Sequence, residues 1–243
     1  MNKILLFAFL FIRLLANGQN SERSLSSENW QFKNSKEDKW LSAKVPGTVH
    51  LDLMDNHMIP DPYKDENEKK VQWLENEDWD YQTQFAISAK ELGNKNIDLV
   101  FDGLDTFAEI YLNGKLLKKT DNMFRKWTVP AKQYLKQGEN SLQIKFKSPV
   151  NTGKELAKKI PFALPESPRS VVRKAQYQFG WDWGPRLVTA GIWKDVRLSF
   201  WDQARMEAVK IEQLKITDKK AELAIHTDIF TEKGGKYTVA VNG

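Results

Sequence analysis

The regular alternation of apolar and polar residues is the feature that most restricts how this chain can fold. Ile97, Leu99 and Phe101 fall at every second position, and the same spacing recurs in the stretches 109–112, 141–147, 192–200, 223–225 and 239–241. Successive side chains of a β-strand point to opposite faces, so a period of two predicts half-buried strands. We therefore expect an all-β protein.

Turn residues separate these stretches. Asn113-Gly114 is the strongest signal, because both residue types tolerate the positive φ of a tight hairpin turn. Further turns are expected at 102–103, 137–138 and 234–235. Several strands at short spacing, without long helices between them, predict an antiparallel β-sandwich. One helix is expected, over 48–58, with Thr48 as its cap.

Two stretches do not fit the strand pattern. Residues 59–63 form a proline-rich loop, and residues 148–173 contain four prolines, too many for a strand. The second stretch is interpreted as a long loop, or as a short helix followed by a loop, and loops of that length are often functional.

A domain boundary is expected near residues 201–207, after which the strand pattern starts again. The residues that follow provide about three strands, whereas an immunoglobulin-like sandwich needs about seven. We interpret residues 19–203 as one sandwich domain and residues 204–243 as the first strands of a second, incomplete, immunoglobulin-like sandwich.

The first eighteen residues have the pattern of a secretion signal. Lys3 precedes the apolar run 4–12, and Ala16-Asn17-Gly18 offers a cleavage site with small residues. The run is shorter than the roughly 20 residues of a membrane span. A buried N-terminal helix is the alternative. The export interpretation places the protein outside the cell, in the periplasm or in a lysosome-like compartment, with no membrane partner.

Composition excludes several functional classes. The chain has no cysteine, which excludes thiol nucleophiles and thiolate metal sites. Its 37 basic and 32 acidic residues are interleaved, so the clustered positive charge of a nucleic-acid-binding protein is missing. The three histidines, His50, His57 and His226, lack the spacing of metal ligands. No metal or other cofactor is expected.

Several motifs, in a fixed order, resemble glycoside hydrolase family 2 and, within it, most closely the β-mannosidases. They cover roughly residues 28–200 and read VPGTVHLDL at 45–53, IPDPY at 59–63, WDY at 79–81, FDGLDTFA at 101–108, YLNG at 111–114, RKAQY at 173–177 and FGWDWGPR at 179–186. The last motif, with the proline-rich loop at 59–63, favours β-mannosidases over β-galactosidases and β-glucuronidases.

The resemblance implies one part of a modular, retaining exo-glycosidase. In such enzymes a jelly-roll (galactose-binding-like) sandwich precedes an immunoglobulin-like sandwich and a catalytic (β/α)8 barrel. Two glutamates of the barrel, about 5–5.5 Å apart, cleave the glycosidic bond. The barrel glutamates are not among these 243 residues, so the chain alone is expected to be inactive. A local catalytic pair among Glu75, Glu77, Asp78 and Asp80 is the alternative, but clustered acids in a polar loop are usually solvated.

The resemblance also implies a sugar site. Asp182 is expected to accept hydrogen bonds from mannose hydroxyls, most plausibly at C4 and C6, because a charged acceptor makes a stronger hydrogen bond. Trp181 and Trp183 are expected to wall the pocket. Arg173 and Lys174 are further candidates, although a solvated or ion-paired role is the alternative for both. The tryptophans could instead be core residues that flank a turn-capping aspartate.

Two other functions stay open at this stage. The chain could be a free-standing carbohydrate-binding module, or a fragment of another family 2 enzyme. The expected partners are β-mannosides and the catalytic barrel of the same full-length protein.

Overall fold

The computed structural model describes residues 20–217 and 219–236. Its contacts separate a first unit, Ser21–Trp201, from a second unit that includes the residues from Asp202 onward. Each unit is described here by itself. The predicted secretion signal and the predicted strand at 239–241 lie outside the described residues, and the domain boundaries stay a prediction.

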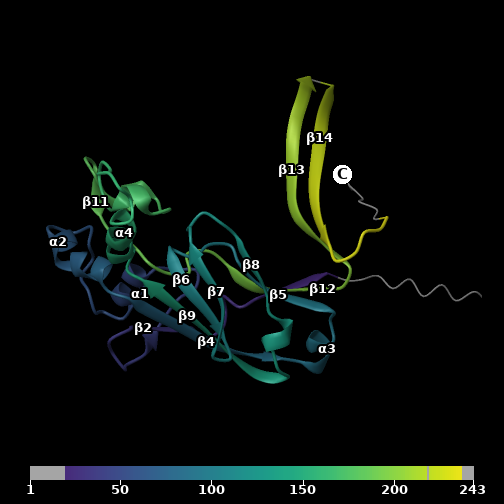
Figure 1. Ribbon diagram of the computed structural model, residues 1–243, viewed down its shortest axis with the longest axis horizontal. Coiled ribbons are helices and arrows are strands. Elements are labelled where there is room, and N and C mark those ends of the chain that lie inside the picture. The colour runs from purple at the N-terminus through teal and green to yellow at the C-terminus, as the bar shows by residue number, and fades with distance from the viewer. Residues whose placement is uncertain (1–19, 218, 237–243) are drawn as a thin grey trace, which may run out of the picture. The chain divides into compact units, whose positions relative to one another are not determined.

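The larger sheet of the first unit has six antiparallel strands in the order β3-β2-β4-β9-β6-β7 (Figure 1). Their bounds are β2 Gln31–Asn34, β3 Leu41–Ser42, β4 Trp79–Ile87, β6 Phe107–Leu112, β7 Lys115–Asp121 and β9 Gly138–Lys147. In β9, Leu142, Ile144 and Phe146 point to the core, while Ser141 is exposed. This is the half-buried pattern that the alternation predicts.

The second sheet has four antiparallel strands in the order β1-β12-β5-β8. Their bounds are β1 Ser21–Ser24, β5 Asn96–Phe101, β8 Trp127–Pro130 and β12 Val196–Trp201. Buried side chains from both sheets belong to one continuous apolar core, so the first unit is a β-sandwich. Its strands are held together by burial and by the ladders between them.

β5 differs from the half-buried strand that its sequence predicts. Asp98 and Val100 are buried as fully as their apolar neighbours, because β5 lies inside its sheet with side chains covering both faces. Asp98 accepts a hydrogen bond from the indole N–H of Trp201, 2.6 Å away, which satisfies its buried oxygen. The strand expected from Ile192 begins only at Val196.

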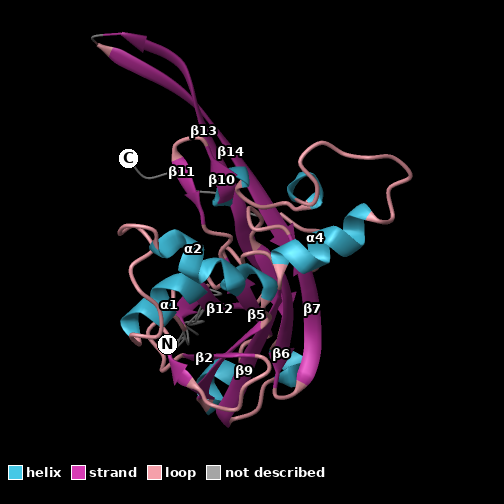
Figure 2. Cartoon of the chain, turned by 90° about the vertical axis from the view of Figure 1, so that its left-hand side faces the viewer, coloured by secondary structure: helices cyan, strands magenta, loops and turns pink. Residues whose placement is uncertain are grey.

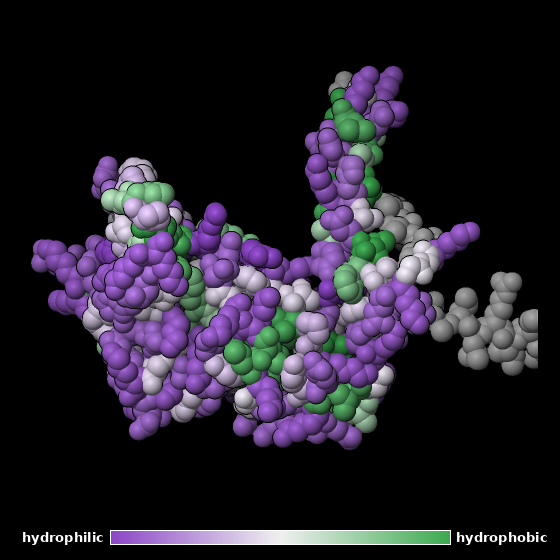
Figure 3. All heavy atoms as spheres, viewed as in Figure 1, coloured by the Kyte–Doolittle hydropathy of each residue, from purple (hydrophilic) through white to green (hydrophobic). Residues whose placement is uncertain are grey.

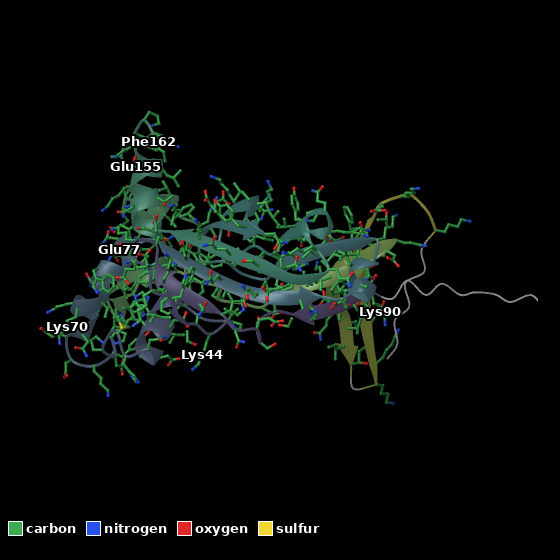
Figure 4. All side chains as sticks on the ribbon, turned by 90° about the horizontal axis from the view of Figure 1, so that it is seen from below. Lys44, Lys70, Glu77, Lys90, Glu155 and Phe162 are labelled. Carbon is green, nitrogen blue, oxygen red and sulfur yellow. The ribbon has the colours of Figure 1, made fainter. Side chains whose placement is uncertain are left out.

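Three of the helices, α1, α2 and α4, lie at one end of the sandwich (Figure 1). The bounds are α1 Val49–Asp55, α2 Asn67–Val71, α3 Ala89–Leu92 and α4 Pro149–Ala157, with 3-10 turns η1 Gln72–Asn76, η2 Lys132–Tyr134, η3 Arg169–Val171 and η4 Gln176–Gln178. α1, α2 and α4 lie at the same end (Figure 2). Figure 4 shows Lys70 of α2 and Glu155 of α4 at this end, and Lys90 of α3 at the other.

The helix predicted over 48–58 is α1, and Thr48 is its N-cap residue, although the Thr48 side chain makes no capping hydrogen bond. α4 confirms the helix-plus-loop interpretation of 148–173, with Ser148 as its cap. α2 and α3 were not predicted. Both are at most five residues long, too short to show the helical spacing of apolar residues.

The predicted hairpin turn at Asn113-Gly114 joins β6 to β7. Both residues have positive φ, 50° and 76°, as the tight hairpin turn requires. The side-chain amide of Asn113 also donates to the carbonyl of Tyr134 in η2 and to the side chain of Asn140 in β9, both at 2.8 Å. These bonds connect the turn to both segments.

In the described part of the second unit, β13 (Ala204–Thr217) pairs with β14 (Lys220–Thr231) to form a long antiparallel hairpin. Nearly all of its described side chains are exposed or half-buried, and apolar side chains run along it (Figure 3). It provides two strands of a second β unit.

Candidate functional site

The site is built around a short hairpin at the helical end of the first unit. β10 (Phe179–Trp181) pairs with β11 (Gly184–Arg186), and Asp182 and Trp183 form the turn between them. Figure 1 places β11 at the end of the sandwich where α2 and α4 lie. Phe179 is buried in a small apolar cluster with Val150, Val172 and Val188, so the base of the hairpin is anchored in the domain.

Gly180 is required by the close approach of the two strands. Its φ is +91°, and a Cβ on it would lie 3.2 Å from the Cβ of Arg186. Most other residues would be strained at that φ and crowded by Arg186. The glycine therefore lets the strands cross closely enough to present the turn.

The turn presents Asp182, which is flanked in the sequence by Trp181 and Trp183. Asp182 is exposed, and Trp181 and Trp183 are 47% and 83% exposed. Their ring centroids lie 5.8 Å apart at an interplanar angle of 59°. The guanidinium carbon of Arg169 lies 5.4 Å from the centroid of the Trp181 ring. These tryptophans are therefore not core residues, which was the alternative interpretation of the motif.

Two hollows adjoin the hairpin. An open hollow of about 500 Å³ is lined by Pro62, Tyr63, Asp65, Glu68, Trp181, Asp182, Trp183, Gly184 and Pro185. A second hollow of about 370 Å³ shares the tryptophans, Pro62, Tyr63, Gly184 and Pro185, and adds Thr48, His50, Leu51, Met54, Tyr177, Gln178, Leu187 and Thr189. Flat aromatic rings beside hydrogen-bonding side chains are the surface that a sugar ring fits.

A buried ion pair lies beneath the second hollow. The Lys174 ammonium contacts both carboxylate oxygens of Asp105 and donates to the Thr189 carbonyl at 2.7 Å. The Thr189 hydroxyl donates to Asp105 at 2.6 Å. Burial lowers the pKa of Lys174, and the Asp105 carboxylate opposes that change. The network fixes Thr189, one of the residues that line the second hollow.

His50 and Asp52 of α1 are both buried, and His50 lies close to this network. Burial, together with the positive charge of Lys174, lowers the pKa of His50 to about 4, so the ring is neutral at pH 7. Its Nδ1 is enclosed and has no hydrogen-bond partner among the described residues. Burial raises the pKa of Asp52 to about 6. Asp52 accepts hydrogen bonds from the Tyr81 hydroxyl (2.6 Å) and the Lys44 amide (2.8 Å).

The structure separates the five residues predicted to bind substrate. Trp181, Asp182 and Trp183 line the open hollow together. Lys174 is buried and ion-paired, so it cannot touch a sugar directly, and this corrects its candidacy as a lining residue. Arg173 is exposed and lies in the lining of neither hollow; its carbonyl accepts from the Met123 amide.

The acids of residues 75–80 hold the structure together, rather than being solvated as the sequence suggests. Glu75 is paired with Arg186, and Asp80 is buried and accepts from the Ser35 hydroxyl at 2.9 Å. Asp78 accepts from the Ser148 amide and from Lys147. Glu77 is paired with Lys36. Each of these carboxylates thus makes a contact that stabilises the domain.

Sequence reasoning missed His50, Thr189 and Tyr63 as lining residues. His50 and Tyr63 lie within motifs that carried the family resemblance, at 45–53 and 59–63, so the motifs contained a signal that was not assigned to single residues. Within residues 20–217 and 219–236, no three His, Asp or Glu side chains are grouped to hold a metal ion. No helix in the described part of the chain has the length and hydropathy to span a membrane.

Comparison with known proteins gives consistent results. The family described as "Glycosyl hydrolase 2 galactose-binding domain-like" matches residues 30–194. Beta-mannosidase B of Emericella nidulans is 36% identical over 232 residues, which cover 89% of this chain and 27% of that protein. The crystal structure of a β-D-mannosidase from Dictyoglomus thermophilum matches with a TM-score of 0.82 at 47% identity, over 88% of this chain and 26% of that one.

A more distant structure, a β-glucuronidase from an uncultured Clostridium species, matches with a TM-score of 0.57 at 18% identity and supports the fold alone. The chain spans about a quarter of the length of the two mannosidases. These likenesses confirm the predicted fold class and the resemblance that the sequence motifs carried.

Proposed function

The chain belongs to glycoside hydrolase family 2 through its galactose-binding-like N-terminal domain, and from this we propose that it is the N-terminal part of a retaining exo-β-mannosidase. In this proposal the protein removes terminal, non-reducing β-D-mannose, and the first unit shapes the mannose subsite. The two relatives that are 36% and 47% identical to the chain are mannosidases, and the chain spans about a quarter of the length of each. The catalytic barrel of the full-length protein would provide both glutamates.

The observation that carries the proposal is that the exposed residue Asp182 and the two exposed indole rings of Trp181 and Trp183 line one hollow. Asp182 and both rings line the same open hollow, together with Tyr63 and Asp65. A carboxylate accepts hydrogen bonds from two neighbouring sugar hydroxyls, and an aromatic ring packs on the apolar face of a pyranose.

The protein's partners and location follow from the same proposal. Its substrate would be a β-mannoside, and the barrel of the same full-length protein would contact the hairpin. The secretion pattern of residues 1–18 favours an exported protein. The 243-residue chain alone is expected not to hydrolyse mannosides, since positioning groups without an acid/base and a nucleophile cannot cleave the bond.

Asp182→Asn in the protein encoded by the complete reading frame tests this proposal. A lost hydrogen bond to a charged group costs about 1.5–3 kcal/mol, so kcat/KM for p-nitrophenyl β-mannoside is expected to fall about tenfold to about 100-fold. Asp121→Asn, an exposed aspartate of β7, is the matched control and should leave kcat/KM unchanged. An unchanged kcat/KM for Asp182→Asn would contradict the role of Asp182 in binding.

The two rival functions are separated by other measurements. A free-standing binding module would bind manno-oligosaccharides in calorimetry without any barrel. A β-galactosidase or β-glucuronidase would prefer the corresponding epimeric aryl glycoside. Sequencing the gene beyond the codon for Gly243 also discriminates: a frame that continues into a barrel with two strand-end glutamates supports the mannosidase.

A further inference from the structure

The tip of the β10–β11 hairpin has little support of its own. Each strand has only three residues, and the pairing joins Phe179 to Arg186 and Trp181 to Gly184. An isolated two-stranded hairpin is marginally stable at best in water. The conformation of Asp182 must therefore be set by what holds the base of the hairpin.

Arg186 connects that base to two other parts of the domain and also holds its two strands together. Its guanidinium donates to both carboxylate oxygens of Glu75, at 2.9 and 2.8 Å, and to the Phe179 carbonyl at 2.9 Å. Its backbone amide donates to Glu68 at 2.7 Å. A two-point contact between arginine and carboxylate fixes the direction of both groups as well as their distance.

Glu75 is in turn held firmly. Its side chain is 12% exposed, and it lies in η1, next to the start of β4. Its carbonyl accepts from the Ser148 hydroxyl at 2.5 Å, and the next carbonyl, that of Asn76, accepts from Asn151 of α4 at 2.9 Å. Because its backbone is held in this way, the Glu75 carboxylate can fix the position of Arg186 and therefore of the hairpin.

From these contacts we propose that Glu75 and Arg186 are positioning residues for sugar binding. Their ion pair fixes the β10–β11 hairpin so that Asp182 and the two indole rings are already in place when the sugar arrives. Neither residue lines the open hollow, so they act through the hairpin. This inference rests on the proposed function of Asp182 and assigns Glu75, an acid with no role in that function, to the same site.

The kinetic consequence is specific. A hairpin that is not fixed must be ordered by each sugar that binds, and that cost is the same in the ground state and in the transition state. Loss of such uniform binding raises KM and leaves kcat unchanged. A merely structural pair would instead lower the melting temperature or the active fraction, with KM unchanged.

The test uses Glu75→Gln and Arg186→Lys in the protein from the complete reading frame, with p-nitrophenyl β-mannoside as substrate. Glutamine keeps the shape but not the charge, and lysine keeps the charge but not the two-point contact. For both variants we expect KM to rise about tenfold while kcat stays within about twofold. The control is Glu91→Gln, which breaks the half-exposed Arg23–Glu91 pair (2.7 Å), and it should leave KM unchanged.

A second measurement follows the hairpin directly. Backbone ¹⁵N relaxation of the 243-residue chain should show residues 180–185 becoming mobile in Glu75→Gln, with β4 and β9 unchanged. An ordered hairpin in that variant, or an unchanged KM while Asp182→Asn raises KM, would overturn the positioning role alone. A mobile hairpin with no effect of Asp182→Asn would support the ion pair's structural control and contradict the proposed function.

Discussion

Strand β9 of the first unit and strand β13 of the second have similar alternating sequences but very different surroundings. Ile144 of β9 is completely buried, whereas Ile211 of β13 is 62% exposed. β9 has paired strands on both edges, and the opposite sheet covers its inner face. Among the residues that the structure describes, β13 pairs with β14 alone. Alternation thus predicts that a strand forms, but its stability depends on what covers the strand.

The same difference applies to charges. The first unit holds Lys174 and Asp105 with side chains that are 0% and 1% exposed. In the second unit, Lys210 and Glu212 are 71% and 48% exposed and 3.4 Å apart. Buried charges interact strongly with each other and are costly to leave alone, whereas exposed pairs contribute little. The following predictions test how far the two units differ, starting from the largest effect.

The largest effect is expected from Lys174→Met. Removal of one partner of a buried ion pair leaves the other charge without compensation, which costs about 3–5 kcal/mol of unfolding free energy. Urea unfolding followed by tryptophan fluorescence measures this loss. Lys210→Met in the exposed pair is the matched control and should leave the unfolding midpoint unchanged.

A double variant keeps the test decisive even if Lys174→Met alone abolishes folding of the first unit. Lys174→Met combined with Asp105→Leu removes both charges, and it should recover most of the lost stability. A double variant as unstable as the single one would show that the hydrogen bonds to Thr189, rather than the unpaired charge, dominate the cost.

The next effect concerns pH, and it arises from two neighbouring residues with opposite shifts. The pKa of His50 falls from 6.5 to about 4, so the unfolded chain binds the proton first, and stability is lost as pH falls through this range. The pKa of Asp52 rises from 3.8 to about 6, so the folded chain binds the proton first, and stability is lost as pH rises through the same range. The two slopes nearly cancel.

Single variants should reveal each slope. In Asp52→Asn the contribution of His50 remains, and the free energy of unfolding should fall by up to about 3 kcal/mol between pH 6.5 and pH 4, since one pKa unit corresponds to about 1.4 kcal/mol. In His50→Phe the slope should be reversed, with greater stability at pH 4 than at pH 6. Urea unfolding at half-unit pH steps measures both, and parallel pH profiles for the two variants would contradict the opposite shifts.

Much of the fold could be predicted from the sequence, for a physical reason. Alternation and the Asn113-Gly114 turn depend on neighbouring residues only, so β5, β6, β9 and β12 were found. The burial of Asp98 could not be predicted, because it depends on Trp201, 103 residues away. The same is true of the short helix α2, whose Glu68 contacts Arg186 only in the folded chain.

The candidate site shows the same division. The family resemblance of the motif at 179–186 implied that Trp181, Asp182 and Trp183 belong to one site, and all three line the open hollow. The motif gave no reason to expect Glu75 as the partner of Arg186, since the pair is separated by 111 residues. Lys174 and Arg173 are adjacent too, yet one is buried and the other exposed. Contacts between distant segments decide such cases.

The smallest effect comes from the same conservative substitution in both units. Ile144→Val removes one methyl group from a packed core and should cost about 0.5–1.5 kcal/mol, whereas Ile211→Val should be close to neutral, because an exposed methyl group has few partners to lose. Urea midpoints measured on the same chain make the comparison direct. An equal cost at the two positions would mean that the apolar side chains of β13 are covered in solution, and the contrast between the units would then reflect what packs against β13 rather than β13 itself.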